Sequence, residues 1–111
     1  SGNFPLWLTT NHVLIIPVGD KHKKQCEKVF KLLENNEIRA LIDDRNETVG
    51  KKIRDGEINK IPYMIIVGDQ EVENLSYPIR GHGGVNFGKK VEAKLVSFFN
   101  EQINNSMEIF N

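Results

Sequence analysis

The sequence contains little of what disulfide-rich, metal-stabilised or membrane-spanning proteins require. Cys26 is its single cysteine, so no internal disulfide can form, and no Cys/His spacing matches a zinc site. No apolar run approaches the ~20 residues of a membrane span, and the N-terminus lacks the charged-then-apolar order of a signal peptide. These absences favour a cytoplasmic protein with no structural metal and no membrane partner.

An excess of charge of one sign is also missing. Fifteen Lys and Arg residues balance fifteen Asp and Glu residues, which gives a formal net charge of zero. Such a chain creates no long-range field that would hold nucleic acid indiscriminately, so DNA binding is not expected and an anionic partner must meet a local patch. With 111 residues the chain is long enough for one domain, residues 1–111, with a single core and at most one site.

The first part of the chain predicts a strand, a helix and a second strand. Residues 13–18, "VLIIPV", are typical of a buried strand, and Asp20 is placed to cap a helix. That helix ends at "ENN", residues 34–36, and a strand follows at 38–42. The two strands should be parallel, with a right-handed crossover. The positions expected to face the core at helical spacing are Cys26, Val29, Phe30 and Leu33.

The second part predicts a further helix at 49–59, ended by Pro62, and a buried strand at 63–67. The stretch "GDQEVENLSYPIRG" reads as two short strands with a turn near residues 74–76, and Pro78 indicates that the second is an edge strand. A last helix should run over 88–104, followed by a frayed tail at 105–111. Its expected inward positions are Val91, Leu95, Phe98, Phe99 and Ile103.

This order predicts an α/β fold: a three-layer α/β/α domain with about five strands in a mixed, mostly parallel sheet and about three helices. Ligands of such sheets gather at the carboxyl ends of the strands. The polar run from Asp43 to Thr48 and the first turn of the helix after it should lie there, together with Glu71 and Arg80. We therefore expect these groups to converge on one rim.

Residues 43–73, "DDRNETVGKKIRDGEINKIPYMIIVGDQEVE", carry a resemblance to a known family. In length and order they are similar to the core of the C-terminal anticodon-binding domain of threonyl-tRNA synthetases, and "FPLWL" at 4–8 looks like the segment that leaves the catalytic domain there. The similarity covers essentially the whole chain. Related domains of histidyl-, prolyl- and glycyl-tRNA synthetases share the fold but lack the "RNE" and "IR" followed by "IPYM" spelling.

The resemblance implies a tRNA-reading module of a longer ligase that attaches threonine to threonine tRNA by using ATP. Residues 1–10 would then be a linker from a catalytic domain outside this chain. ATP, Mg and Zn are expected only in that domain, and no cofactor or catalytic residue is expected in this one. The parent protein would be a homodimer formed through its catalytic domain.

In this family the domain reads the second and third anticodon letters, G and U, and the resemblance carries that role onto Asn46, Arg54, Glu71 and Arg80. The residue types suit these bases. An arginine can hold the O6 and N7 edge of guanine while a glutamate accepts from N1–H and N2–H₂, so Glu71 and Arg80 are assigned to G. An amide suits uracil, so Asn46 is assigned to U, with Arg54 on a carbonyl or a phosphate. Unpaired loop bases are readable because their Watson–Crick edges are free.

Several residues have simpler explanations. Arg54 could instead be a structural partner of Asp43 or Asp44. After Arg80 the family often carries further basic residues, whereas this chain has "GHGGVNFG", which offers fewer cations for phosphate contacts; its glycines either leave the loop flexible or let the backbone approach the RNA closely. Cys26 fits a core position. The lysines of the first helix and the charged face of the second helix are most simply solvated surface; the second face comprises Lys51, Lys52, Asp55, Glu57 and Lys60.

Other functional classes stay open at the level of sequence. One is the anticodon-binding domain of a related class II synthetase, specific for proline, histidine or glycine. Another is a free-standing module that binds a small ligand, although "PVGDKHKK" after the first strand carries one glycine and no phosphate-binding fingerprint. A third is a protein-interaction module.

Overall fold

The structure, a computed structural model, describes the backbone of residues 12–110 and the side chains of residues 12–104. The expected linker at 1–10 lies outside the described residues. The elements, in chain order, are β1 (Val13–Pro17), the 3₁₀ turn η1 (Asp20–His22), α2 (Lys23–Asn35), β2 (Ala40–Ile42), α3 (Val49–Ile58), β3 (Tyr63–Val67), α4 (Asp69–Asn74), β4 (Ser76–Gly81), η2 (His82–Gly84), β5 (Asn86–Val91) and α5 (Glu92–Phe110).

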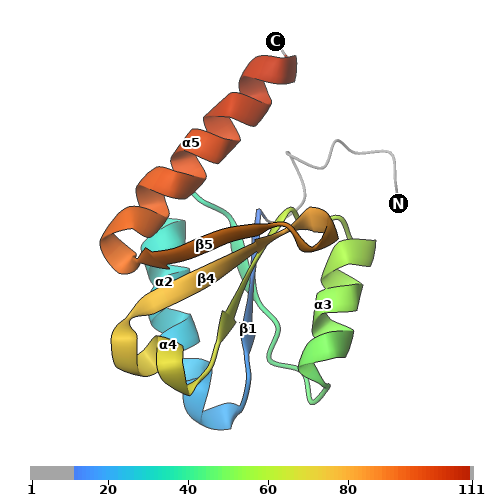
Figure 1. The fold of residues 1–111 in the computed structure, drawn as a ribbon, viewed down its shortest axis with the longest axis vertical. Helices are drawn as coiled ribbons and strands as arrows, with labels where there is room; N and C mark the ends of the chain where they lie inside the picture. Colours follow the sequence, from blue (N-terminus) through green and yellow to red (C-terminus); the bar gives the residue numbers. More distant parts are fainter. Residues whose placement is uncertain (1–11, 111) are drawn as a thin grey trace.

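The five strands form one mixed sheet in the order β2-β1-β3-β4-β5 (Figure 1). Strand β1 pairs in parallel with both β2 and β3, which confirms the predicted βαβ unit. Strands β4 and β5 add two antiparallel pairings. Helices α2 and α5 cover one face of the sheet and α3 covers the other, so the predicted three-layer α/β/α fold is confirmed.

The core has two parts because the central strands are buried on both faces. Val13 and Ile15 of β1 face α2 and α5, while Leu14 and Ile16 face α3. The predicted helix positions Cys26, Val29 and Leu33 of α2 are fully buried, and burial raises the pKa of the Cys26 thiol to about 12. A β-branched strand that is apolar on both faces is what a covered parallel sheet requires.

The stretch expected to be a strand before residue 74 is instead the short helix α4. The alternation in "EVENL" suggested a strand, but end contacts fix a helix here. The Glu71 carboxylate accepts a hydrogen bond from the Gly68 N–H, 2.7 Å away, at its start. At its end the Leu75 N–H donates to the Glu71 carbonyl, with Leu75 in the left-handed region. A capping side chain at N3 is a local signal that outweighs short alternation.

Residues 88–91, expected to begin the last helix, belong to strand β5. Val91 continued the helical spacing of Leu95, yet it is exposed and pairs with Ser76 of β4. Leu95 and Phe99 are buried and Phe98 and Ile103 are partly buried, as predicted. Helix α5 continues to Phe110, past the expected end at Asn104. The strand pairing with β4, which the helical periodicity does not reveal, decides where α5 begins.

Two finer predictions are wrong. Strand β4 is not an edge, because it lies between β3 and β5. Pro78 is tolerated in it because the pairing of β4 with β3 ends at Ile79 and the pairing of β4 with β5 shifts register between Pro78 and Arg80. Asp20 does not cap a helix. Gly19 precedes the 3₁₀ turn η1, and its N–H donates to Nδ1 of His22, 3.0 Å away.

Candidate nucleic-acid interface

The loop of residues 43–48 leaves the end of β2 and is fastened at both ends. The Asp43 N–H donates to the Ile15 carbonyl at 2.9 Å, so the loop begins as a continuation of the sheet. At its other end the Thr48 hydroxyl accepts from the Lys51 N–H at 3.1 Å and caps α3. Such a cap satisfies a free backbone donor in the first turn of the helix. The loop is therefore short and anchored at one end to the sheet and at the other end to α3.

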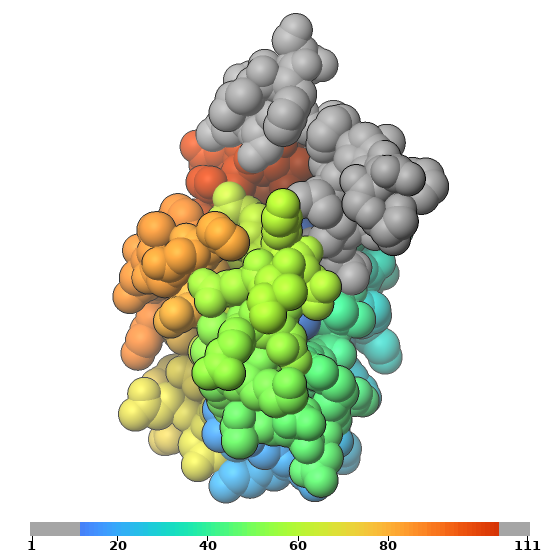
Figure 2. Space-filling view, turned by 90° about the vertical axis from the view of Figure 1, so that its right-hand side faces the viewer, coloured from blue at the N-terminus to red at the C-terminus, as the bar shows by residue number. Residues whose placement is uncertain are grey.

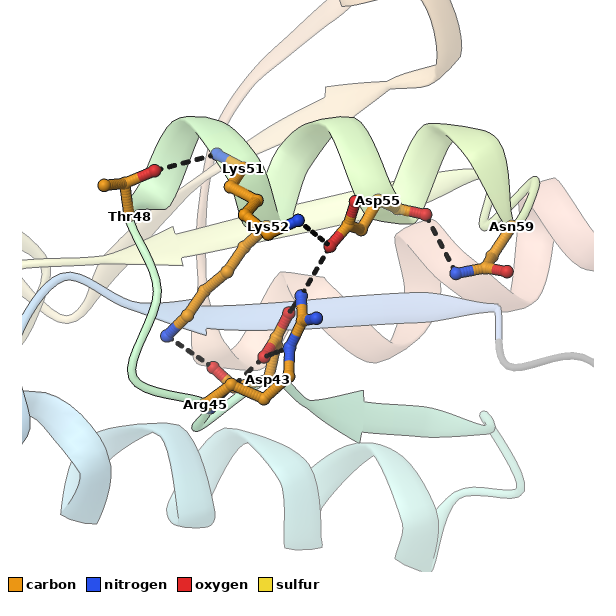
Figure 3. Close-up of polar contacts among 7 residues, drawn as sticks. All are labelled: Asp43, Arg45, Thr48, Lys51, Lys52, Asp55 and Asn59. Atoms are coloured by element: carbon orange, nitrogen blue, oxygen red, sulfur yellow. Dashed lines mark hydrogen bonds and ion pairs between the residues drawn. The ribbon is translucent and has the colours of Figure 1, made fainter.

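Arg45 lies between two carboxylates in the middle of this loop (Figure 3). Its Nε and Nη2 donate to the two carboxylate oxygens of Asp43, both at 2.8 Å, and Nη2 also donates to Oδ2 of Asp55 at 3.0 Å. Hydrogen bonding to Arg45 lowers the pKa of Asp43 and of Asp55 and is the largest cause of both shifts. Both carboxylates therefore stay ionised well below neutral pH.

Lys52, on the buried side of α3, also holds the loop to this helix. Its side chain is only 4% exposed, and Nζ donates to the Asp43 carbonyl at 2.9 Å (Figure 3). Asp43 is thus held through its carboxylate by Arg45 and through its carbonyl by Lys52. A buried ammonium needs such a partner because desolvation without one is costly.

Asn46 and Arg54, two of the predicted site residues, are exposed and carry free hydrogen-bonding groups. Within the described part of the chain neither side chain makes a hydrogen bond or an ion pair. The alternative that Arg54 pairs with Asp43 or Asp44 is therefore wrong, because Arg45 occupies Asp43. Arg54 lies one helical turn from Gly50 and from Glu57 on one stripe of α3.

Glu71 and Arg80 come from different ends of the sheet. Glu71 is half-buried in α4, after the carboxyl end of β3, and Oε1 accepts from Gly68 while Oε2 has no partner among the described residues. Arg80 pairs in register with Met64, near the start of β3. The rise per residue puts Met64 about 10 Å from Val67 along the strand. The expectation that the four groups converge on one rim is wrong, because β4 runs antiparallel to β3.

Arg80 nevertheless lies on the same face of the sheet as α3. Cross-strand partners share a face, and Met64 packs in the core beneath α3. The Nε of Arg80 is buried and has no hydrogen-bond partner among the described residues. A buried donor without a partner is unusual in a folded protein.

The glycine-rich turn after β4 flanks α3 (Figure 2). Gly83 and Gly84 have positive φ values of 74° and 85°, so the turn depends on glycine. The Gly83 N–H donates to Oε2 of Glu57 on α3, 3.3 Å away. Asn46, Arg54 and Arg80 therefore border a strip along α3 and the exposed side of β4, whereas Glu71 lies apart from it in α4.

Four residues that organise this strip were not predicted as site residues. Lys52, Asp55 and Glu57 were assigned to a solvated helix face, yet Lys52 is buried and the two acids contact Arg45 and Gly83. Arg45 was not singled out at all. The burial of Lys52 could have been predicted from helical spacing. Lys52 lies one turn before Gly56 and next to Ile53, on the side of α3 that faces the sheet.

One histidine is paired with a carboxylate. Nε2 of His22 lies 2.7 Å from Oδ1 of Asp69, while Nδ1 accepts from Gly19. The His22 side chain is 6% exposed, so no substrate reaches it, and the pair joins η1 to α4. Among residues 12–104 no cluster of His, Cys, Asp or Glu could hold a metal ion, and no helix in this range is long and apolar enough to cross a membrane.

Comparison with known proteins gives matches over most of the chain. The anticodon binding domain family matches residues 12–101. A threonine–tRNA ligase of Flavobacterium johnsoniae is 46% identical over 112 residues, which cover 99% of this chain and 17% of that protein. A threonine–tRNA ligase of Bacteroides fragilis is 44% identical over 105 residues, which cover 95% of this chain and 16% of that protein.

Solved structures share the fold. The RNA binding domain of threonyl-tRNA synthetase from Cryptosporidium parvum Iowa II superposes with a TM-score of 0.79 at 20% identity, covering 90% of this chain and 25% of that one. The chain spans only 16–17% of the length of the two curated relatives described above. Because the family match extends over residues 12–101 and includes all four predicted site residues, the chain belongs to the anticodon-binding domain family.

Proposed function

We propose that this chain reads the anticodon loop of threonine tRNA as the RNA-recognition part of a longer threonine–tRNA ligase. Threonine–tRNA ligases that are 46% and 44% identical over nearly the whole chain support the amino-acid specificity. The observation that carries the proposal is unused hydrogen-bonding capacity along one strip. Asn46, Arg54 and Nε of Arg80 have no protein partner among the described residues.

Guanine, the second anticodon letter, is assigned to Arg80 and Glu71. The guanidinium of Arg80 donates to O6 and N7, and Oε2 of Glu71 accepts from N1–H and N2–H₂. Oε1 of Glu71 already accepts from Gly68, which fixes the orientation of the carboxylate. The separation of the two residues along the sheet leaves room for a base between them, with each side chain at a different edge.

Uracil, the third letter, is assigned to Asn46. Its amide offers one donor group and one acceptor, which complement a uracil carbonyl and N3–H. Arg54 lies in the second turn of α3, beyond the loop end, and contacts a carbonyl or a phosphate. Its side chain is exposed and unpaired among the described residues, so little must be broken before it binds RNA.

The whole protein, on this proposal, joins threonine to its tRNA with ATP in the cytoplasm. The ATP, Mg and Zn sites and the homodimer contact belong to a catalytic domain outside this chain. This chain alone should therefore catalyse no threonine-dependent exchange of pyrophosphate into ATP. Exchange by the purified 111-residue chain would contradict that division of labour.

The test of base reading is Arg80→Ala, measured with two RNA hairpins that carry the threonine anticodon loop with the middle letter G or A. Loss of a bidentate contact should cost about 1–3 kcal/mol with the G hairpin and little with the A hairpin. Lys28→Ala is the control, because Lys28 is exposed on α2, on the far side of the sheet. An Arg80→Ala loss that is equal for both hairpins would mean that Arg80 only holds the backbone or the fold.

Overall affinity gives a second check. With a net charge of zero and no contact to the rest of the tRNA, the chain should bind the hairpin with a dissociation constant of about micromolar or weaker, and binding should weaken as salt rises. Nanomolar binding that survives high salt is not compatible with this proposal.

A further inference from the structure

We propose that Arg45 is a positioning residue for base reading: clamped between Asp43 and Asp55, it holds Asn46 at a fixed place on the loop, ready for the base. This inference rests on the proposed function, in which Asn46 reads the third anticodon letter. Arg45 itself acts through the loop and not through contact with RNA. Figure 3 shows its side chain turned toward α3 between the two carboxylates.

The clamp joins the loop of residues 43–48 to α3 with a rigid group. The Nε and Nη2 atoms of Arg45 bind the two oxygens of Asp43 in parallel, at 2.8 Å each, so the plane of the guanidinium is fixed. Nη2 also reaches Oδ2 of Asp55 on α3 at 3.0 Å. The Asp43 carboxylate is 8% exposed and that of Asp55 26% exposed, so neither is free to follow a moving loop.

Asn46 is held because it lies at the centre of a tight turn. The Glu47 N–H donates to the Arg45 carbonyl at 2.9 Å, a contact between residues two apart that encloses Asn46 alone. Asn46 is not among the residues with positive φ, so this is an inverse γ-turn. One side of the turn is Arg45, whose side chain is fixed by the clamp. The backbone position of Asn46, from which its side chain projects, therefore follows from the position of Arg45.

The positive charge of Arg45 is already paired with carboxylates of the protein. Two carboxylates contact its guanidinium, whereas Arg54 has none within the described residues. A phosphate would have to compete with both acids for Arg45. The clamp is also poorly placed to serve stability alone, since the Arg45 side chain is 48% exposed and ion pairs at such sites contribute little to folding. The clamp restrains the loop that carries the unbonded amide of Asn46. Restraint of a binding group before binding reduces the entropy lost when the ligand binds.

The experiment measures binding of the 111-residue chain to two hairpins that carry the threonine anticodon loop with U or C as the third letter. Asp55→Asn removes the negative charge from one arm of the clamp without changing the size of the side chain. Its matched control is Asp20→Asn, which removes an equally charged carboxylate whose one ion pair among the described residues is with Lys23, at 3.3 Å. We expect the ratio of U to C affinity to fall about 2- to 10-fold in Asp55→Asn and to stay unchanged in Asp20→Asn.

Electrostatics alone predicts the opposite trend for affinity. Removal of a negative charge near the RNA should strengthen binding of any RNA, with no change in the ratio. A loss of discrimination together with equal or tighter binding of the C hairpin therefore identifies positioning. The ratio for the middle letter, G against A, should not change, because Arg80 and Glu71 lie outside the loop.

Two further variants complete the test. Asn46→Ala should abolish the U to C preference, and adding Asp55→Asn to it should change nothing more, because the two act through the same contact. Arg45→Lys keeps the charge but loses the parallel donor pair, and should reproduce Asp55→Asn. Circular dichroism and thermal unfolding establish that each variant is folded.

The experiment distinguishes failure of third-letter reading by Asn46 from failure of the positioning role of Arg45. If the unmodified chain binds both hairpins equally, the proposed reading of the third letter is wrong and the positioning role falls with it. If the unmodified chain discriminates and Asn46→Ala does not, while folded Asp55→Asn and Arg45→Lys discriminate as well as the unmodified chain, then base reading stands and the positioning role of Arg45 is overturned.

Discussion

Glu57 of α3 accepts a hydrogen bond from the backbone N–H of Gly83, 3.3 Å away, and so connects the helix to the glycine-rich turn between β4 and β5. Apart from this contact the turn is exposed, and Gly83 and Gly84 both have positive φ. Arg80 lies two residues before His82, where this turn begins. The Glu57 contact therefore restrains the backbone next to the residue that we assign to guanine.

The first prediction follows from this contact. In Glu57→Ala the Gly83 amide should lose its protection, and its hydrogen exchange should accelerate about 2- to 10-fold, as expected for loss of one weak, exposed hydrogen bond. Glu57→Gln keeps an acceptor oxygen and should retain most of the protection. Exchange measured by NMR at the Gly83 amide decides the matter. Equal exchange in Glu57→Ala and the unmodified chain would show that the contact does not hold the turn in solution.

The second prediction compares two glycines of the same helix. A Cβ on Gly56 would lie 2.7 Å from Cδ2 of Leu14 and 2.8 Å from Cε of Met64, whereas a Cβ on Gly50 meets nothing within 4 Å. Gly56→Ala should destabilise the fold by about 1–3 kcal/mol, because α3 must move away from the sheet or both side chains must repack. Gly50→Ala should be neutral or stabilise it by up to about 1 kcal/mol, because alanine favours helices.

Urea unfolding of the two variants supplies the measurement, and each serves as the control for the other. The helix propensity gain is common to both, so the difference between them isolates the close approach at Gly56. Equal stabilities would mean that the ends of Leu14 and Met64 move aside without cost. Such an outcome would remove the packing reason for a glycine at this position.

The sequence was sufficient for the parts of the fold that depend on local periodicity. The buried runs of β1 and β3 and the apolar face of α2 predicted the parallel βαβ core, because a central parallel strand is apolar on both faces and a covering helix is apolar on one. The four candidate base-reading residues came from resemblance, and all of them lie within the matched family region.

The errors arose where distant contacts override local pattern. Residues 88–91 have helical spacing with Leu95, yet pairing with β4 makes them a strand. Arg45 and Asp55 are ten positions apart, and their contact depends on how the loop folds back onto α3. Their adjacency cannot be calculated from spacing, because loop conformations have no fixed period. The convergence of Glu71 and Arg80 on one rim failed for the same reason, since it depended on the direction of β4.

The third prediction concerns Tyr77, which is fully buried beneath α2 and α5. Its hydroxyl accepts from Gln25 and donates to Oε1 of Glu92 at 3.0 Å. Tyr77→Phe should cost about 1–3 kcal/mol of unfolding free energy, because the buried Gln25 amide loses an acceptor. Tyr63→Phe, which removes a partly buried hydrogen bond to Gln102, should cost less, about 0.5–1.5 kcal/mol. Urea unfolding at neutral pH measures both.

The same tyrosines give an optical test. Burial raises the pKa of Tyr77 to about 12 and also raises the pKa of Tyr63, and these are the chain's two tyrosines. Phenolate absorbance should therefore be low at about pH 10 in the folded chain and appear on unfolding. Because the folded pKa values are raised, the tyrosines contribute stability that is complete below about pH 10 and is lost as the pH rises toward 12. Half-titration of the folded chain at about pH 10 would contradict burial of both hydroxyls.

The last prediction is the pH dependence that Arg45 imposes. Its hydrogen bonds are the largest cause of the lowered pKa values of Asp43 and Asp55, each below the ordinary value of 3.8. A carboxyl whose folded pKa is lowered binds its proton more weakly in the folded state than in the unfolded one. Its contribution to stability is therefore complete above 3.8 and is lost as the pH falls through the folded pKa.

Arg45→Met removes this cause, so the effect of burial, which raises the pKa of Asp43, is then opposed only by the backbone N–H of residue 45 and by the charge of Lys52. The variant should be less stable than the unmodified chain at neutral pH, and the two unfolding free energies should converge as the pH falls below about 4, through the lowered pKa values of the two carboxyls. Urea unfolding across that range measures the convergence. Lys28→Met, which removes a cation on the far side of the sheet, should leave the shape of the curve unchanged. Parallel curves for Arg45→Met and the unmodified chain would mean that Arg45 does not hold either carboxylate in its ionised form, and the clamp would have no electrostatic basis.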